Sequence, residues 1–210
     1  MKNILVLSPH TDDAELGCGA SIIRFIEEGN NILWIVFSTA EESVPVNMKK
    51  NTLELEFLNV ARKLHLSNND FKINHFRVRY LHEKRQDVLE LLIKTREEFK
   101  PSLVIGPSLN DFHQDHVVIA NEMVRAFKSS SSIICYELPW NHFTFNTQYF
   151  ITLNKKYIEK KIELLSCYKS QIIKNRGYFS PEYIYGIAKT RGIQINADYA
   201  EAFEVIRWIE

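Results

Sequence analysis

The chain has 210 residues, a length that suits one domain, and its 45% hydrophobic and 25% charged content is typical of a globular protein with a sizeable core. Lysine plus arginine and aspartate plus glutamate both total 26, so the bulk charge gives no argument for binding nucleic acid. The three cysteines, Cys18, Cys135 and Cys167, form no C-x-x-C pair, which favours a reducing compartment over a disulfide framework.

The N-terminal apolar run, Ile4–Leu7, is shorter than the roughly 7–15 residues of a signal-peptide hydrophobic region. No apolar stretch approaches the roughly 20 residues that a membrane-spanning helix requires. We therefore expect a cytoplasmic protein without a membrane span.

Predicted strands and helices alternate along the chain. Continuous apolar runs predict buried strands at 4–7, 32–37, 73–76, 103–106, 133–138 and 149–153, with a short strand or hydrophobic tail at 203–208. Helical spacing of apolar residues predicts helices at 14–28, 49–66, 84–99, 117–127, 155–166 and 180–190. The alternation predicts an α/β fold with a Rossmann-like, doubly wound, mostly parallel sheet, helices on both faces, and a single domain over residues 1–210.

Two clusters of histidines and aspartates follow predicted strands. They are His10, Asp12 and Asp13 after the first strand, and His113, Asp115 and His116 after the strand at 103–106. In open α/β sheets, ligands bind outside the carboxyl ends of the strands, so we expect the two clusters to meet. Such a set is typical of a catalytic metal site, in which three protein ligands leave one position open.

The residue types indicate metal-assisted hydrolysis. His10 and Asp13 are spaced to face one point, and one histidine of the second cluster would complete the ligand set. Asp12 is then placed to accept a proton from water whose pKa the metal lowers toward about 7. A second histidine, oriented by Asp115, would stabilise an oxyanion or protonate the leaving amine.

Each of these residues also has a structural interpretation. Asp12 or Asp13 alone is typical of a helix N-cap, and Asp115 of a cap on the next helix. His10 alone is typical of a loop. Their joint occurrence at two strand ends favours a functional site.

Two other site types are not supported. Gly17 and Gly19 do not complete a dinucleotide-binding fingerprint, because Ile22 stands where a third glycine or alanine is required. These glycines are more typical of close packing between a helix and its neighbours. Neither Ser8 nor Ser38 lies in a G-x-S-x-G elbow, so we do not expect a serine hydrolase.

At "SPHTDDAELGCG" (8–19) together with "HQDH" (113–116), the sequence resembles the PIG-L/LmbE-like family of metal-dependent N-deacetylases. "CYKSQ" (167–171) and "YAEAF" (199–203) extend the resemblance over nearly the whole chain. The resemblance implies hydrolysis of the N-acetyl group of a small-molecule amino sugar or its conjugate. It is also compatible with a homo-oligomer.

The resemblance also implies roles for single residues. Asp12 resembles the general base. His113, with Asp115 as its partner, resembles the residue that stabilises or protonates the tetrahedral intermediate. Zinc is the implied cofactor, with iron or cobalt as alternatives for the same donor set. The implied metal ligands are His10, Asp13 and His116.

Some features depart from the family pattern or leave alternatives open. Thr11 replaces the usual proline, and Leu53 stands where the family often has an arginine, so substrate contacts from that helix are undefined. The basic segment 154–177 would attract a phosphorylated or nucleotide-linked sugar or, the interpretation we favour, form a solvated helix face. The aromatic-rich loop after a predicted strand would stack on a sugar ring or pack against the sheet edge; its residues are Tyr136, Trp140, His142 and Phe143.

Two rival functions remain open at the level of sequence. One is a metal-dependent hydrolase of another bond, either an amide or a phosphate ester. The other is a non-catalytic sugar-binding protein on the same fold. Comparing hydrolysis of N-acetyl compounds with hydrolysis of phosphate esters distinguishes a deacetylase from the first rival. A protein that binds no metal, or that hydrolyses nothing with metal present, would favour the second rival.

Overall fold

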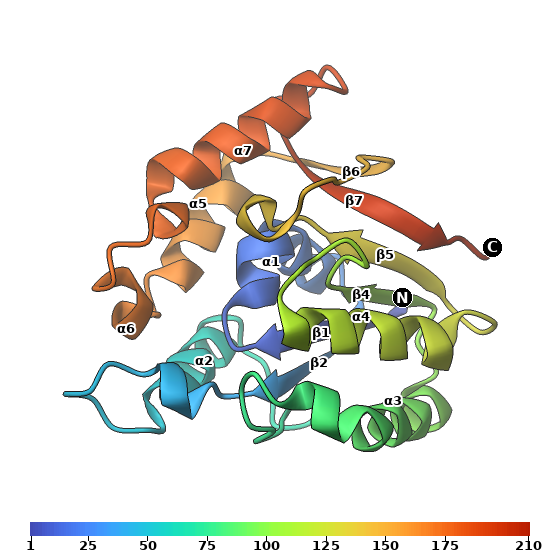
Figure 1. Cartoon of the computed structure of the whole chain (residues 1–210). Helices are drawn as coiled ribbons and strands as arrows, with labels where there is room; N and C mark the ends of the chain where they lie inside the picture. Colours follow the sequence, from blue (N-terminus) through green and yellow to red (C-terminus); the bar gives the residue numbers. More distant parts are fainter.

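The computed structural model describes residues 1–210, and one seven-stranded sheet forms its centre (Figure 1). The strands lie in the order β3-β2-β1-β4-β5-β7-β6. The first five of these are parallel, whereas β7 runs antiparallel to both β5 and β6. The strands are β1 (Asn3–His10), β2 (Asn31–Ser38), β3 (Phe71–Ile73), β4 (Leu103–Gly106), β5 (Ser132–Tyr136), β6 (Tyr149–Leu153) and β7 (Tyr199–Arg207).

Helices cover both faces of the sheet (Figure 1). One face carries α1, α2, α5 and α7 around a core of 31 buried residues, and the other carries α3 and α4 around a core of 17. Alternate residues of β1 enter the two cores, which explains why its apolar run is continuous. The helices are α1 (Asp13–Glu27), α2 (Thr52–Lys63), α3 (Arg85–Phe99), α4 (Gln114–Phe127), α5 (Lys155–Leu165), α6 (Lys169–Ile172) and α7 (Pro181–Ile193).

The strand order creates a topological switch point between β1 and β4. From β1 the chain continues to β2 and β3 on one side, and later to β4 and β5 on the other. Segments that leave the carboxyl ends of β1 and β4 therefore start side by side and then diverge. This is the position where open α/β sheets bind ligands.

The structure confirms the predicted fold class and corrects some element bounds. Helix α4 begins at Gln114 instead of residue 117, so Asp115 and His116 lie in its first turn and not in the preceding loop. Strand β3 is Phe71–Ile73 instead of 73–76. The expected short strand or tail at 203–208 is the nine-residue strand β7, whose pairing with β5 and β6 is long-range and leaves little local signal. No helix has the length and apolar character required to cross a membrane.

Helix α1 is kinked at Cys18, where the backbone leaves helical geometry (φ −146°, ψ 26°). A buried ion pair from the C-terminal part of the chain contacts both sides of the kink. Glu201 on β7 accepts the backbone N–H of Ser21 (2.7 Å), and Lys161 on α5 donates to the carbonyl of Leu16 (2.7 Å) and to Glu201 (2.7 Å). The pair satisfies backbone groups released by the kink and braces the half of α1 that begins at the strand end.

Gly17 permits a close approach that a side chain would prevent. A Cβ atom at Gly17 would lie 2.4 Å from Cδ2 of Tyr136, a fully buried side chain. We expect Gly17→Ala to lower the free energy of unfolding by about 1–3 kcal/mol, because overpacking forces backbone or rotamer shifts. Urea unfolding of the purified variant measures the change.

Gly186→Ala is the matched control for this prediction. No atom lies within 4 Å of a Cβ placed at Gly186 on the surface of α7. Alanine there should leave stability unchanged or raise it by up to about 1 kcal/mol, since alanine favours helix more than glycine. A Gly17→Ala protein as stable as wild type would contradict the tight contact with Tyr136.

Candidate metal centre

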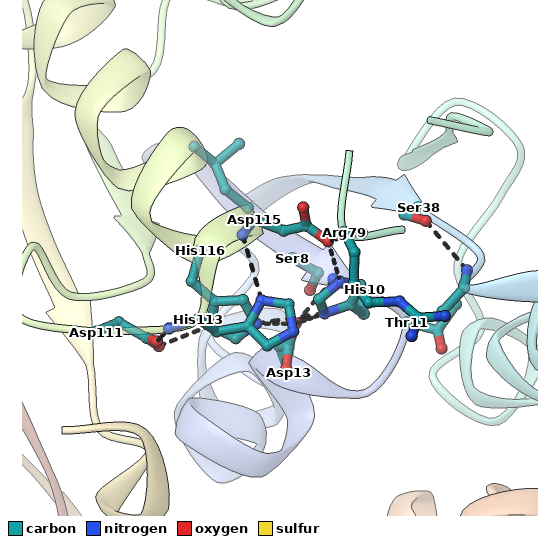
Figure 2. A network of polar contacts seen from close by, with 12 residues as sticks. Ser8, His10, Thr11, Asp13, Ser38, Arg79, Asp111, His113, Asp115 and His116 are labelled. Carbon is teal, nitrogen blue, oxygen red and sulfur yellow. Dashed lines mark hydrogen bonds and ion pairs between the residues drawn. The ribbon is translucent and has the colours of Figure 1, made fainter. Parts of the chain in front are cut away.

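The two predicted clusters meet at the carboxyl ends of β1 and β4 (Figure 2). His10 is the last residue of β1, and Asp13 is the first residue of α1. His116 comes from the first turn of α4, which follows β4. Neighbouring parallel strands thus bring together residues that are more than 100 positions apart, as expected from the pattern.

Three side-chain atoms converge within a few ångströms. Asp13 Oδ2 lies 3.1 Å from His10 Nδ1 and 3.1 Å from His116 Nε2, and the two nitrogens are 3.3 Å apart. A tetrahedral ion with bonds of about 2.0–2.1 Å has ligand atoms separated by about 3.3 Å. These residues therefore present one face of a tetrahedral donor set, with a chemistry that suits zinc and other divalent transition metals.

A second layer of carboxylates orients the two imidazoles. Asp111 Oδ2 lies 2.7 Å from His116 Nδ1, and Asp115 Oδ2 lies 3.0 Å from His10 Nε2. Metal-binding histidines are commonly held in this way by a carboxylate on the ring nitrogen that faces away from the metal. The arrangement leaves His10 Nδ1 and His116 Nε2 directed at Asp13, where a cation would be held.

Asp111 was missed by the sequence reasoning, which considered only the histidines and Asp115 of the second cluster. Its other oxygen, Oδ1, accepts the backbone N–H of His113 (2.8 Å), so one carboxylate orders both histidines of the loop. The available signal was an additional acidic residue in the polar loop after β4. Sequence spacing did not identify His116 as the partner of Asp111, because the contact between them depends on where α4 begins.

The predicted partnership of Asp115 with His113 involves the backbone of Asp115, whose N–H donates to His113 Nδ1 (3.3 Å), and not its carboxylate. The carboxylate contacts His10 instead, and it also accepts the backbone N–H groups of Arg79 (2.6 Å) and Leu81 (3.3 Å). Because Asp115 lies inside the first turn of α4, its carboxylate reaches the end of β1. Asp115 is thus a support for the first cluster.

His113 occupies the N-cap of α4, and its ring Nδ1 accepts the backbone N–H of Asp115 (3.3 Å). A ring whose Nδ1 is an acceptor carries its proton on Nε2 when neutral. Burial and the neighbouring His116 and His10 lower the pKa of His113 to about 4. The neutral ring therefore offers an Nε2–H donor beside the convergent atoms.

The structural interpretation of the first cluster is not supported by its contacts. Asp12 stands at the N-cap of α1 but forms no side-chain cap hydrogen bond, and Asp13 accepts the backbone N–H of His10 (2.8 Å). Asp12 lines the cavity beside the site. Burial and the adjacent charge of Asp13 raise its pKa to about 6, which increases its affinity for a proton.

The electrostatics of the site favour a positive charge at its centre. Burial lowers the pKa of His10, but the Asp13 charge and the hydrogen bond with Asp115 outweigh it and raise the value to about 9. Asp13 and Asp111 likewise overcome burial and raise the pKa of His116 to about 10. Burial raises the pKa of Asp13, but His116 and His10 outweigh it and hold the value well below its usual range. A divalent cation would supply this positive charge in place of the protons.

A cavity of about 240 Å³ opens over the convergent atoms. Helix α2 contributes Leu53 to its wall, and the loop after β5 contributes Trp140, whereas Phe143 is exposed. The segment after α6 contributes Arg176 and Tyr178. The nitrogens of His10, His113 and His116 also lie within 4.8 Å of one another, so the His113 ring stands beside the same point.

The fold and this site define an α/β protein with a candidate metal site of histidines and aspartates at the switch point of its sheet. The chain matches the sequence profile of the PIG-L family, described as GlcNAc-PI de-N-acetylase, over residues 5–127. It therefore belongs to this family. The match confirms the predicted family membership and the predicted enzyme class, an N-deacetylase.

Individual proteins agree with the assignment. The chain is 26% identical over 172 residues to YaiS of Escherichia coli K12, described as an uncharacterized deacetylase, covering 80% of this chain and 91% of that protein. The structure is similar to N,N'-diacetylchitobiose deacetylase from Pyrococcus horikoshii (TM-score 0.77, 19% identity, 98% of this chain and 84% of the other). It is also similar to GalB, the 4-carboxy-2-hydroxymuconate hydratase of Pseudomonas putida KT2440 (TM-score 0.78, 20% identity, 100% and 99%).

Metal content tests the donor set directly. We expect about one equivalent of divalent metal per wild-type chain, and loss of this metal from His10→Ala/Asp13→Ala, because two of three ligands are removed. Plasma mass spectrometry of the purified proteins measures the content. His82→Ala, at an exposed position outside the cluster, is the control and should retain metal. A wild-type protein that stays metal-free after incubation with zinc would contradict the site.

Asp111→Asn tests the second layer. The variant keeps the shape of the side chain but removes the charge that faces His116, so we expect metal affinity to fall on the order of 10–100-fold. Competition with a chelating indicator measures the affinity, and circular dichroism verifies the fold. Asp87→Asn, at an exposed position on α3, should have no effect. Unchanged affinity in Asp111→Asn would rule out its supporting role.

Proposed function

We propose that the protein is a zinc-dependent hydrolase that removes the N-acetyl group from an amino sugar or sugar conjugate, with residues 1–210 as one catalytic domain. The observation that carries the proposal is the convergence of His10, Asp13 and His116 in one cavity with Asp12 and His113. The chain's membership of the de-N-acetylase family supports the reaction class. The joining of β5, β6 and β7 to the same sheet supports a single domain.

In this proposal His10, Asp13 and His116 hold the metal. When bound, zinc supplies a Lewis acid for the acetyl carbonyl and lowers the pKa of water. Asp111 and Asp115 keep the two imidazoles in the orientation that binding needs. The remaining chemistry belongs to Asp12 and His113.

Asp12 is the proposed general base. Its carboxylate is not used as a helix cap and faces the cavity beside the metal ligands. It takes a proton from the water that attacks the acetyl carbon. It then returns this proton to the nitrogen of the leaving amine as the tetrahedral intermediate collapses. One carboxylate thus serves both proton transfers, and acetate and a free amine are released.

His113 is the proposed hydrogen-bond donor to the oxyanion. The backbone N–H of Asp115 occupies its Nδ1, so the neutral ring presents Nε2–H to the cavity. A preorganised donor aimed at developing negative charge stabilises the tetrahedral intermediate. The hydrogen bond favours this role over the alternative of an imidazolium acid that protonates the amine.

Three further observations support the substrate class and the location. The chitobiose deacetylase that the structure resembles acts, by its name, on an N-acetylated sugar. Trp140 and Tyr178 in the cavity wall offer aromatic surface, and Asn141 and Gln171 offer amides for sugar hydroxyls. The three cysteines are unpaired, which supports the proposed cytoplasmic location.

The structural similarity to a hydratase shows that proteins with this fold catalyse different reactions, so the reaction has to be tested directly. Acetate release from N-acetylglucosamine and diacetylchitobiose tests the proposal against a phosphoesterase, for which p-nitrophenyl phosphate is the probe. Release of acetate without hydrolysis of the phosphate ester is expected. Metal-loaded protein that releases no acetate from any N-acetyl compound would refute the deacetylase proposal and favour a binding protein.

Asp12→Asn tests the general base. We expect kcat for acetate release to fall on the order of 10²–10⁴-fold, because the amide cannot accept the proton, while metal content stays at the wild-type level. Asp198→Asn, outside the cavity, is the matched control and should keep wild-type activity. An Asp12→Asn protein with wild-type kcat would show that another group takes the proton.

A further inference from the structure

The basic segment at 154–177 divides into two parts in the structure. The lysines of α5 face carboxylates, and the helix packs against α1 with one buried ion pair and several exposed ones. This agrees with the structural interpretation for α5. The pairs are Lys155–Glu159 (3.4 Å), Lys156–Glu27 (3.3 Å), Lys160–Glu27 and Lys161–Glu201 (2.7 Å).

Lys174 and Arg176, in the loop after α6, differ from these lysines. Lys174 Nζ donates to Gln171 Oε1 (3.2 Å) and to the carbonyl of Ser43, and Arg176 Nη1 donates to the hydroxyl of Tyr178 (2.6 Å). Neither cation has a carboxylate within 4.0 Å. Four of the five N–H donors of Arg176 thus remain without a partner in the protein.

Arg176 lies in the wall of the catalytic cavity. It lines the same space as Asp12 and His113, and its charge lowers the pKa of Lys174, which burial also depresses. The two positive charges are therefore close to one another and to the reacting end of the cavity. Repulsion between them is relieved when an anion binds.

The loop that carries Arg176 is held in place by packing and hydrogen bonds. Tyr178 stacks on Trp140 with ring centroids 4.0 Å apart and an interplanar angle of 12°, and Phe179 is buried. At the start of the segment, the hydroxyl and the backbone N–H of Ser170 donate to Glu56 of α2 (2.6 and 2.8 Å). These contacts join the loop to α2, beside which α6 lies in Figure 1. Such preorganisation favours ligand binding.

The rest of the cavity lining adds no second cation. Ala40, Leu53 and Val78 are apolar, and Arg176 is the only lysine or arginine among the lining residues. Burial raises the pKa of Asp12 in the same cavity and the charge of Arg176 opposes this rise, but no carboxylate pairs directly with the guanidinium. A carboxylate or phosphate of a substrate matches the planar guanidinium, whereas a neutral sugar offers it no charge.

We propose that the substrate carries a carboxylate or phosphate group close to its N-acetyl amine and that Arg176, with Lys174 behind it, binds this anion. The inference rests on the proposed deacetylase function and adds the charge of the substrate. Arg176 is a specificity residue for the anion, and Lys174 adds positive potential.

The test compares three N-acetyl sugars: neutral N-acetylglucosamine, N-acetylglucosamine 1-phosphate and N-acetylmuramic acid, which carries a carboxylate. We expect wild-type kcat/KM to be highest for one of the two anions, and the preferred anion identifies its chemistry. Arg176→Gln should lower kcat/KM for that compound on the order of 10–100-fold through KM, the size of a lost charge-assisted pair. The same variant should lower kcat/KM for N-acetylglucosamine far less than for the preferred anion, because the neutral sugar makes no charge-assisted pair with the guanidinium.

Two further variants act as controls. Arg176→Lys keeps the charge but not the fork and should retain part of the preference. Lys169→Gln removes a positive charge from the exposed face of α6, outside the cavity, and should retain all of it.

The outcomes separate this inference from the proposed function. Equal kcat/KM for neutral and anionic compounds, or an Arg176→Gln variant that lowers kcat for all three, overturns the anion subsite while the deacetylase proposal stands. If no compound releases acetate, the deacetylase proposal fails. The anion subsite is then tested by titration calorimetry, which measures binding of the anionic sugars to the protein. Binding of an anionic sugar to wild type but not to Arg176→Gln then supports it, and equal or absent binding overturns it.

Discussion

The carboxylate of Asp13 lies between two imidazoles that come from the two sides of the switch point in the sheet. It is buried, and its negative charge is stabilised by the imidazoles of His10 and His116 at 3.1 Å and by the backbone N–H of His10 at 2.8 Å. The imidazoles are held in turn by Asp115 and Asp111. Every other part of the site is arranged around this contact, and the pairing of β1 with β4 maintains it.

The C-terminal third of the chain lies outside the region that matches the family profile, yet it positions the region inside it. Glu201 and Lys161 brace the kink of α1, and the hydroxyl of Tyr168 lies within hydrogen-bond distance of the carbonyl of Thr11 (2.5 Å) and of the Glu15 carboxyl group. Both sets of contacts act on the turn that carries Asp12 and Asp13, or on the helix directly after it. The same part of the chain also supplies the cationic side of the cavity. The cavity is therefore lined by residues both inside and outside the region that matches the family profile.

The contacts around His113 illustrate how a helix end assigns a chemical role. An N-cap ring that accepts a backbone N–H through Nδ1 has only Nε2–H left to present to the cavity. The proposed role of His113 as a hydrogen-bond donor thus rests on its position at the start of α4. A hydratase and deacetylases share this fold, so the reaction is decided by such individual placements and not by the architecture.

The sequence by itself determined the α/β class, the two clusters that meet and the family, because continuous apolar runs, helical spacing and short motifs are local signals. It did not reveal that the Asp111 carboxylate contacts His116 or that the Asp115 carboxylate contacts His10, since these bonds depend on where α4 begins. The place of β7 between β5 and β6 was equally hidden. The sequence also did not reveal that Arg176, about 160 residues after Asp12, lines the same cavity. Only tertiary structure decided these features, because side-chain partners far apart in sequence are set by packing and strand pairing, which have no local signature.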